Sequence, residues 1–441
     1  MGLFRRKKPE PQPEVEPEPE PTLPTPPPMD EHGFRSVEEQ RAWTLSMVNE
    51  LPPFGMQLLD TLGLGLCEDI RADVDLPGFD NSAMDGYAVR AADIASAAAD
   101  VPIVLPVAGV IAAGDSAAEP LAEGTALRIM TGAPVPPGAD AVIPFEQTDR
   151  GSEEARFLAP IAVGANIRPR GGDIRQGDLL ISEGTRIDDR TVGLLAGVGI
   201  DKVMVRPRPR VVVISTGAEL IEPGHELGHG QIFDSNSWML TAAARAAGAQ
   251  AFRVGLVNDD PETVFQTISD QLVRADLVVT SGGVSEGDHD VIKQVMPDLG
   301  LVDFARIAMQ PGKPQGFGLI GEDEIPCFML PGNPVSSFVS FEVFVRPAIR
   351  KLMGVEPAVR PAVRAIASTV LRSKPGKAQF HRGYLKIDAS GRKMVEQVGG
   401  TGSHLLGGLQ RANALILMPP EVETVAAGQA VLVWPLSEDL A

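Results

Sequence analysis

Three patterns of apolar and polar residues follow one another along the chain, and each predicts a different kind of region. From residue 210 onward, short apolar runs such as "RVVVISTG" and "DLVVTSGG" alternate with segments of helical period such as "SWMLTAAARAAG". Strands that alternate with helices form a mostly parallel sheet covered by helices on both faces. The pattern therefore predicts a central, doubly wound α/β domain at residues 209–355, which ends in one long helix at residues 334–353.

Short apolar runs separated by Gly, Pro and Asp turns stand on both sides of this domain. "VPIVLPVAGVI" and "ALRIMTGAPV" precede it, and "QFHRGYLKI" and "VLVWPL" follow it. Closely spaced short strands are typical of small β-domains of barrel or sandwich type. We therefore predict an inserted β-domain at about residues 76–165, within an extended linker region at residues 34–208. A second, small β-barrel-like domain is predicted at residues 361–437.

The N-terminal segment shows neither pattern. Residues 9–28 contain ten Pro and five Glu, so they have almost nothing to bury. This composition predicts a disordered tail at residues 1–33, and deleting residues 1–30 is expected to leave stability unchanged. Order is expected to begin with a helix capped by Ser36 and Glu39, which have the spacing of a capping box, and stopped by Pro52 and Pro53.

Length and charge limit what the protein can do. The chain has 441 residues, enough for two to four domains, and a formal net charge of −19. Such an acidic body is unsuited to broad binding of nucleic acid. No run approaches the ~18 to 20 apolar residues of a membrane span. The two cysteines, Cys67 and Cys327, are too far apart for a CxxC site, and their small number is consistent with a reducing, cytoplasmic location.

The ends of the predicted parallel strands carry the candidate chemistry, because ligands of open α/β sheets bind beyond these ends. Gly-rich turns expose backbone N–H groups and suit phosphate, whereas acids at the same edge suit a hard cation. Together they predict a phosphorylated ligand held with Mg²⁺. The segments concerned are "STGAEL" (215–220), "NDDP" (258–261), "SGGVSEGDHD" (281–290), "MQPGKPQG" (309–316) and "LPGNPVSS" (330–337).

Some of these residues also have simpler interpretations. Asp259 and Asp260 precede Pro261 and could cap a helix. The loop that ends in Asp290 could be no more than a solvated turn. Asp259 and Asp290 are expected at the ends of adjacent strands. The segment "FDNSAMDGYA" (79–88) shows neither period, so it is poor material for a strand or a helix.

Several long motifs occur in an order that resembles one known family. They are "PGFDNSAMDGYAV", "IMTGAPVP", "STGAEL", "SGGVSEGDHD", "PGKP" and "LPGNPVSS", followed by "SKPG", "GSHLL" and "RANAL". Over about residues 36–435 the chain resembles the molybdopterin molybdenumtransferases, bacterial relatives of the gephyrin E domain. The resemblance implies a central molybdopterin-binding domain and an elongated homodimer in which the N-terminal linker region takes part in dimerisation.

The resemblance also implies a reaction and its partners. Adenylylated molybdopterin and molybdate are the substrates, Mg²⁺ assists cleavage of the phosphoanhydride, AMP is released and molybdenum enters at the dithiolene. Contacts with a molybdopterin adenylyltransferase and with apo-molybdoenzymes are implied as well. Two alternatives are a non-catalytic molybdopterin-binding scaffold on the same fold and an adenylyltransferase that acts one step earlier. The complete set of acids argues against the scaffold, and the additional β-domains argue against the adenylyltransferase.

Carried over position by position, the family's motifs imply a set of site residues. The catalytic positions fall on Asp85, Thr131, Glu219, Asp259 and Asp290. Among these, the metal ligands would be Glu219, Asp259 and Asp290. The substrate-binding positions fall on Ser215, Thr216, Gly217, Ser281, Gly282, Gly283, Ser285, Lys313, Pro331, Gly332, Asn333 and Pro334. The loop with Asp85 would come from another domain, through the partner subunit.

Three positions depart from the family's usual pattern. Ala218 stands where Asp is frequent, Gly172 stands where Glu is frequent, and Gln310 stands where Lys is frequent. These changes affect secondary contacts and leave the main acids in place.

Overall fold

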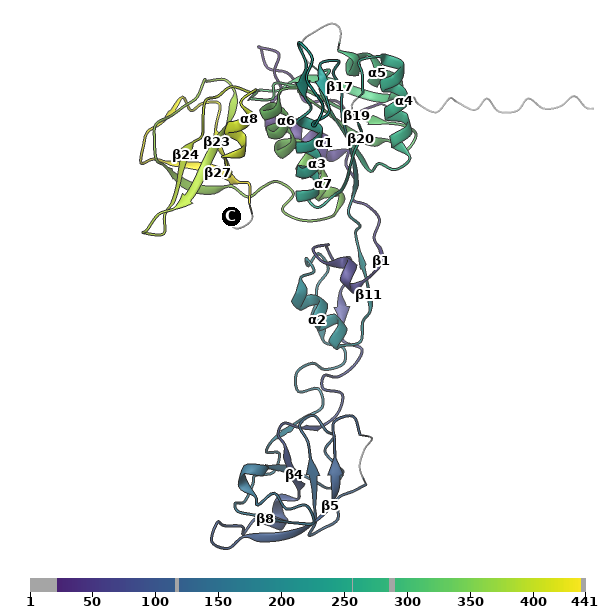
Figure 1. The fold of residues 1–441 in the computed structure, drawn as a ribbon, viewed down its shortest axis with the longest axis vertical. Helices are drawn as coiled ribbons and strands as arrows, with labels where there is room; N and C mark the ends of the chain where they lie inside the picture. Colours follow the sequence, from purple (N-terminus) through teal and green to yellow (C-terminus); the bar gives the residue numbers. More distant parts are fainter. Residues whose placement is uncertain (1–21, 116–118, 256, 285–289, 438–441) are drawn as a thin grey trace, which may run out of the picture. The chain divides into compact units, whose positions relative to one another are not determined.

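The computed structural model describes residues 22–115, 119–255, 257–284 and 290–437. These residues form two compact units (Figure 1). Of the residues described, those up to Pro52 and from Arg206 onward form the first unit, and Pro53–Val205 form the second unit. Each unit is described by itself below.

A mixed six-stranded sheet lies at the centre of the first unit, in the order β15-β12-β16-β20-β19-β17. The first four strands are parallel, and the last two are antiparallel to their neighbours. This arrangement confirms the predicted α/β domain. The strands are β12 (Arg210–Ser215), β15 (Gln250–Arg253), β16 (Leu277–Ser281), β17 (Gly300–Arg306), β19 (Pro314–Ile320) and β20 (Ile325–Leu330).

Helices cover both faces of this sheet because the chain reverses its direction of winding. Right-handed crossovers that lead from β12 to β15 and from β15 back to β16 place their helices on opposite faces. These helices are α3 (Asn236–Ala246) and α4 (Pro261–Leu272), and α5 (Val291–Leu299) packs beside α4. Val212 and Ile214 of β12 are fully buried against α4 and α5, so a continuous apolar strand is required here.

The reversal creates a switch point between β12 and β16. The connection after β12 runs to β15 on one side, and the connection after β16 leads to strands on the other side. Open α/β sheets bind ligands at such a point. The expectation that Asp259 and Asp290 follow adjacent strands is wrong, because β12 lies between β15 and β16.

The long helix predicted at residues 334–353 is interrupted. It consists of α6 (Pro334–Ser340), a π-helical segment (Phe341–Val345) and α7 (Arg346–Leu352). Pro347 lies in the first turn of α7 and has no N–H to donate to the preceding turn. A change of helical type directly before it is therefore consistent with its missing donor.

A closed five-stranded barrel forms the C-terminal part of the first unit and confirms the predicted barrel-like domain. Its strands pair in the cycle β23-β24-β21-β27-β25, and β25 returns to β23. Closure requires Gly383, where a Cβ would lie 2.8 Å from Ile416 and 3.0 Å from Val395. The strands are β21 (Val363–Ala367), β23 (Ala378–Ile387), β24 (Lys393–Gln397), β25 (Ala414–Met418) and β27 (Ala430–Pro435).

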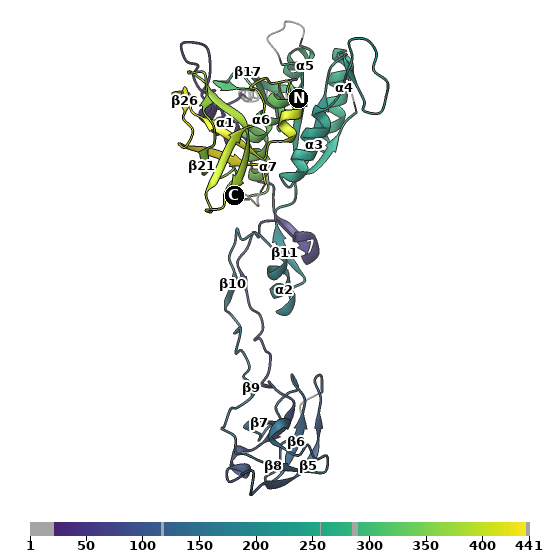
Figure 2. The same cartoon turned by 60° about the vertical axis from the view of Figure 1, so that its left-hand side comes forward.

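The second unit contains a five-stranded sheet in the order β7-β4-β6-β5-β8, together with short ladders and the helix α2 (Asp189–Gly197) (Figure 2). It contains the predicted β-domain. The sheet strands are β4 (Gly86–Val89), β5 (Ile103–Ile111), β6 (Ala126–Ile129), β7 (Ala141–Pro144) and β8 (Glu154–Phe157). The ladders pair β1 (Phe54–Gln57) with β11 (Lys202–Val205), β2 (Ile70–Arg71) with β10 (Leu179–Ile181), and β3 (Asn81–Ser82) with β9 (Ile167–Arg168).

The prediction that "FDNSAMDGYA" contains no strand is wrong, because β3 and the first residues of β4 lie within it. Gly86 pairs so closely with β7 that a Cβ would be 1.9 Å from the Ile143 carbonyl oxygen. Tyr87 is fully buried in the sheet. Between the two strands, Met84 and Asp85 are exposed, so the segment is a connection presented by strands.

The first helix, α1 (Val37–Ser46), begins as predicted. Ser36 is its cap, and the Ser36 hydroxyl accepts a hydrogen bond from the Glu39 amide at 3.3 Å. The predicted end at Pro52 is wrong, since the helix stops at Ser46. The Leu51 amide donates to the carbonyl of Leu352 at 2.8 Å, so this part of the chain has left the helix to contact the end of α7.

The residues just before α1 make specific contacts. The buried Trp43 donates its indole N–H to the Pro24 carbonyl at 3.1 Å. The Asp30 carboxylate accepts from the amides of His32 and Phe34 at 2.9 and 2.8 Å. None of the helices in the ranges given above is long and apolar enough to cross a membrane.

Because of these contacts, we expect that only the part of the tail before Pro24 can be removed without an effect on stability. Deleting residues 1–29 removes the acceptor of Trp43, and we expect the free energy of unfolding to fall by about 1 kcal/mol. Deleting residues 1–21 keeps Pro24 and serves as the control. Thermal unfolding of both truncated chains measures the difference, and equal melting temperatures would contradict the role assigned to Pro24.

Candidate functional site

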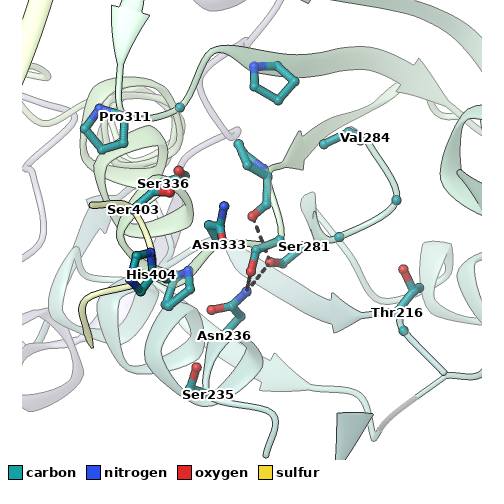
Figure 3. A pocket seen from close by; sticks show the side chains of 18 of the residues that line it. Thr216, Ser235, Asn236, Ser281, Val284, Pro311, Asn333, Ser336, Ser403 and His404 are labelled. Carbon is teal, nitrogen blue, oxygen red and sulfur yellow. Dashed lines mark hydrogen bonds between the residues drawn. The ribbon is translucent and has the colours of Figure 1, made fainter. Parts of the chain in front are cut away.

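A cleft of about 1140 Å³ opens at the carboxyl ends of the parallel strands (Figure 3). The turns that follow β12 and β16 form its floor at the switch point. Further walls come from the loop at residues 309–314, from the segment at residues 331–336 and from residues 401–404 of the barrel. All of these segments belong to the first unit.

Most of the residues predicted for the site line this cleft. They are Thr216, Gly217, Glu219, Asp259, Ser281, Gly282, Gly283, Asp290, Lys313, Pro331, Gly332, Asn333 and Pro334. Ser215 is placed differently, because it is the last residue of β12 and only 1% exposed. Ser285 lies outside the described residues.

Two turns touch each other at the floor of the cleft. Gly282 has a φ of +101°, and a Cβ at this position would lie 2.6 Å from the carbonyl oxygen of Thr216. The Thr216 amide donates to the Ser281 carbonyl at 3.2 Å. The Thr216 hydroxyl is buried and has no hydrogen-bond partner among the residues described. Since buried polar atoms are costly without a partner, this hydroxyl is a candidate ligand contact.

Asn236 at the start of α3 joins three segments of the cleft (Figure 3). Its side-chain amide donates to the Ser281 hydroxyl at 2.9 Å and to the Gly332 carbonyl at 2.6 Å. Ser281 in turn lies 3.0 Å from the hydroxyl of Ser337, which donates to Pro331. Within the described part of the chain, the buried Asn236 Oδ1 has no partner. The residue can therefore hold the floor together and still accept a hydrogen bond from a ligand.

The two adjacent acids at the start of α4 do different things. Asp260 caps the helix, because its carboxylate accepts from the amide and hydroxyl of Thr263 at 2.9 and 2.6 Å. The Thr263 donors lower the pKa of Asp260. Asp259 does not cap α4. Its carboxylate accepts from the Ala218 amide at 2.9 Å, so it reaches across the sheet edge to the turn that carries Glu219.

The remaining acid, Asp290, directly precedes α5. Its Oδ2 lies 3.8 Å from the ammonium of Lys293. In the ranges that the structure describes, no three His, Cys, Asp or Glu side chains form a group that could hold a metal ion. Glu219, Asp259 and Asp290 therefore share a cleft without forming a closed set of metal ligands.

Two lysines, Lys313 and Lys377, line the cleft along with four carboxylates. The loop that carries Lys313 is fixed from behind by Gln315, which is 6% exposed. The Gln315 side-chain amide donates to the Gly312 carbonyl and to the Ser340 hydroxyl, both at 2.6 Å. This buried pair of hydrogen bonds limits the movement of the lysine's backbone.

The barrel contributes a loop that was not assigned to the site from the sequence. Ser403 and His404 line the cleft, and the Ser403 carbonyl accepts from the Val335 amide at 3.0 Å. The buried Arg382 donates to the carbonyls of Gly400 and Leu405 at the two ends of this loop. Burial lowers the pKa of Arg382. The motif "GSHLL" contains both lining residues and was the available signal.

In the second unit the structure brings Asp85 and Thr131 together. The Asp85 carboxylate accepts from the amide and the hydroxyl of Thr131 at 2.7 and 2.8 Å. These hydrogen bonds hold the pKa of the Asp85 carboxyl below its usual range. Both residues are exposed, so an ionised carboxylate with a fixed orientation is presented to the surface of this unit.

Comparison with protein families accounts for most of the chain. Residues 35–199 match the family described as "MoeA N-terminal region (domain I and II)". Residues 212–351 match "Probable molybdopterin binding domain", and residues 364–436 match "MoeA C-terminal region (domain IV)". The three matches follow the order of the β-domain region, the α/β domain and the barrel.

Similar proteins of known name extend over nearly the whole chain. "Molybdopterin molybdenumtransferase 2" of Mycobacterium tuberculosis is 42% identical over 409 residues, which cover 91% of this chain and 100% of the relative. "Molybdopterin molybdenumtransferase" of Haemophilus influenzae is 37% identical and covers 84% of this chain and 90% of its own. A solved structure of the Pyrococcus horikoshii "molybdopterin biosynthesis moea protein" aligns with a TM-score of 0.78 at 33% identity. It covers 92% of this chain and 99% of that chain.

The contact between the two turns yields a prediction about stability. Gly282→Ala places a Cβ against the Thr216 carbonyl. Gly230→Ala is a matched control, since Gly230 has a φ of +81° and open space around it. Both variants carry the cost of an unfavourable φ, roughly 1–2 kcal/mol. Gly282→Ala is expected to lose a further ~1–3 kcal/mol through overpacking. Urea unfolding compares the two variants, and equal losses would contradict a tight contact.

Proposed function

Since the chain belongs to the molybdopterin molybdenumtransferase family, we propose that its cleft binds adenylylated molybdopterin and molybdate and releases AMP. The protein is a transferase of molybdenum cofactor biosynthesis. The observation that carries the proposal is the cleft at the β12–β16 switch point. There, groups that can donate hydrogen bonds to phosphate and carboxylates line one cavity.

The chemistry of the substrate matches this mixture of groups. Its two phosphates are joined by a phosphoanhydride, which is cleaved so that AMP leaves while the dithiolene receives molybdenum. In the turn after β16, the Gly282 amide already donates to the Leu330 carbonyl at 3.1 Å, so the Gly283 N–H is the group that this turn would offer to phosphate. Lys313 supplies a cation held on a fixed loop. The free acceptor of Asn236 and the Thr216 hydroxyl offer directional contacts to a bound ligand.

Magnesium is the cation that we assign to this cleft. Mg²⁺ is usually held by one or two carboxylates together with substrate phosphates rather than by a complete cage of protein ligands. Glu219, Asp259 and Asp290 are the residues that would hold it, and their separate placement along one cleft suits a site shared with substrate. When bound, the ion would neutralise negative charge on the phosphates.

Asp85 and Thr131 are assigned to the same reaction through a homodimer. Their hydrogen-bonded pair lies in the second unit, whereas the cleft lies in the first unit. In the proposed dimer, the second unit of one subunit completes the cleft of its partner. The ionised Asp85 would then add a carboxylate to a site that would hold a metal ion and anionic substrates.

The alternative functions are not favoured. A scaffold would not require the cleft acids, and an adenylyltransferase would not require the second unit. The relatives at 37–42% identity are named molybdopterin molybdenumtransferases, and their alignments cover 84–91% of this chain. We further propose a cytoplasmic location, since the chain has only two cysteines, Cys67 and Cys327, which are too few for a disulfide framework. A molybdopterin adenylyltransferase and apo-molybdoenzymes are the proposed protein partners.

The direct test supplies adenylylated molybdopterin, Mg²⁺ and molybdate to the purified chain. Molybdate-dependent release of AMP, together with molybdenum bound to the pterin product, is the expected result. Absence of AMP release under conditions in which a related molybdenumtransferase is active would reject the proposed reaction.

The neighbouring acids Asp259 and Asp260 provide a matched pair for the role of the cleft carboxylates. Asp259→Asn is expected to lower the rate of AMP release roughly 100- to 1000-fold, the usual effect of removing a preorganised electrostatic group. Asp290→Asn should behave alike, with substrate binding retained in both variants.

Asp260→Ala is the control, because it removes the cap of α4 and leaves Asp259 in place. It should cost about 1 kcal/mol of stability and little activity. Melting temperature, substrate affinity and AMP release separate the two effects. Near-normal turnover in both Asp259→Asn and Asp290→Asn would remove these acids from the reaction.

Mixed dimers test the shared site. When Asp85→Asn and Asp290→Asn chains are combined, each heterodimer has one intact site, and about a quarter of the wild-type activity should return. Combining Asp259→Asn with Asp290→Asn should restore nothing, because both residues lie in the first unit. Equal recovery in the two mixtures, with heterodimers demonstrated by mass spectrometry, would argue against a cleft completed by the partner.

A further inference from the structure

The cleft needs cations, because the proposed ligands are anions and four of its lining residues are acids. Lys313 is held on a loop fixed by Gln315. Lys377, which lies just before β23 in the barrel, is half-buried and lines the same cleft. A lysine side chain is long and flexible, so its use as a binding group depends on what orders it before the ligand arrives.

An aromatic ring from the N-terminal segment provides such an ordering contact. The Lys377 ammonium lies 4.4 Å from the centre of the Phe34 ring. The Arg306 guanidinium lies 4.6 Å from the same centre. Phe34 is only 9% exposed. The negative face of an aromatic ring attracts cations, and the attraction increases as water is excluded.

Backbone hydrogen bonds fix the ring relative to the lysine. The Arg35 amide donates to the Arg306 carbonyl at 2.9 Å, and the Ala308 amide donates to the Arg35 carbonyl at 2.8 Å. The Ala378 amide, next to Lys377, donates to the Ala308 carbonyl at 2.8 Å. The N-terminal segment, the end of β17 and the start of β23 therefore lie side by side directly behind the cleft wall.

The N-terminal segment is also anchored by charge. Arg35 is 5% exposed, and its guanidinium donates to the carboxylate of Asp303 on β17 at 3.1 Å and to the Gln40 side chain on α1 at 3.3 Å. Phe34 thus has a fixed position set by residues on both sides of it. The sequence gives no sign of this arrangement, since Phe34 and Lys377 lie at opposite ends of the chain.

We propose that Phe34 is a positioning residue, which holds the Lys377 ammonium at the cleft wall so that this cation binds the phosphate groups of the substrate. The inference rests on the proposed function for the identity of the phosphorylated ligand. The ammonium carries three N–H donors, the groups that bind phosphate oxygens. The segment that follows the Pro/Glu-rich tail would in this way act on ligand affinity without touching the ligand.

Binding of AMP, measured by calorimetry in Mg²⁺-containing buffer, tests the proposal without relying on turnover. Lys377→Met should weaken AMP binding about tenfold, the effect of losing one partly screened charge contact. Phe34→Leu keeps an apolar side chain but removes the ring, and it should weaken binding about threefold. Phe34→Tyr keeps the ring and should bind as the wild type does. Lys374→Met is the control for charge, since Lys374 is exposed and does not line the cleft.

The double variant Phe34→Leu/Lys377→Met separates positioning from general destabilisation. If Phe34 acts through Lys377, adding Phe34→Leu to Lys377→Met should change AMP affinity no further. The salt dependence of binding should also fall equally in Lys377→Met and in the double variant. An equal threefold loss in both backgrounds, or wild-type affinity in Phe34→Leu, would overturn the proposal.

Failure of the proposed function has a different signature. A wild-type chain that binds AMP with the Phe34 and Lys377 dependence described, but releases none from adenylylated molybdopterin, would reject the reaction and retain the positioning role. A wild-type chain that turns over normally, with AMP affinity insensitive to both residues, would reject the positioning role and retain the reaction.

Discussion

The close contact between the turns after β12 and β16 is the constraint on which the rest of the site depends. A side chain at Gly282 would collide with the backbone of Thr216, so the two parallel strands can end together only because this position lacks one. Their ends then form a single floor, to which Asn236 attaches the segment at residues 331–333. The acids and lysines of the walls are placed relative to this floor.

Charge sets the second condition. The cleft presents more carboxylates than cations, although the proposed ligands are themselves anionic. The two lysines of the cleft are held in place by neighbouring residues. Gln315 holds the loop of Lys313, and Phe34 lies against Lys377. A few fixed hydrogen-bond donors can bind phosphate well, because the entropy cost of ordering them is met when the protein folds and not when the ligand binds. The carboxylates can then serve a divalent cation bound together with the substrate.

The sequence predicts the regular parts of the molecule and misses contacts between distant segments. Strand and helix alternation led to the α/β domain, because continuous apolar runs such as Val211–Ile214 must be buried on both faces. The strands in "FDNSAMDGYA" were missed because the close pairing of Gly86 with β7 depends on the absence of a side chain and not on a hydrophobic period. Asn236 was missed because its partner Gly332 lies 96 residues away. The motifs nevertheless singled out Asp259, which lines the cleft, and its hydrogen bond to Ala218 distinguishes it from a cap.

The short strand β18 (Met309–Gln310) has a mechanical consequence. It belongs to the loop that carries Lys313, yet it pairs with β23 of the barrel through residues 378 and 379. The α/β domain and the barrel are therefore joined by backbone hydrogen bonds along one edge of the cleft. A hinge motion that swung the barrel away would have to break these backbone pairs. Ligand passage by separation of the two domains at this edge would carry the cost of breaking these hydrogen bonds.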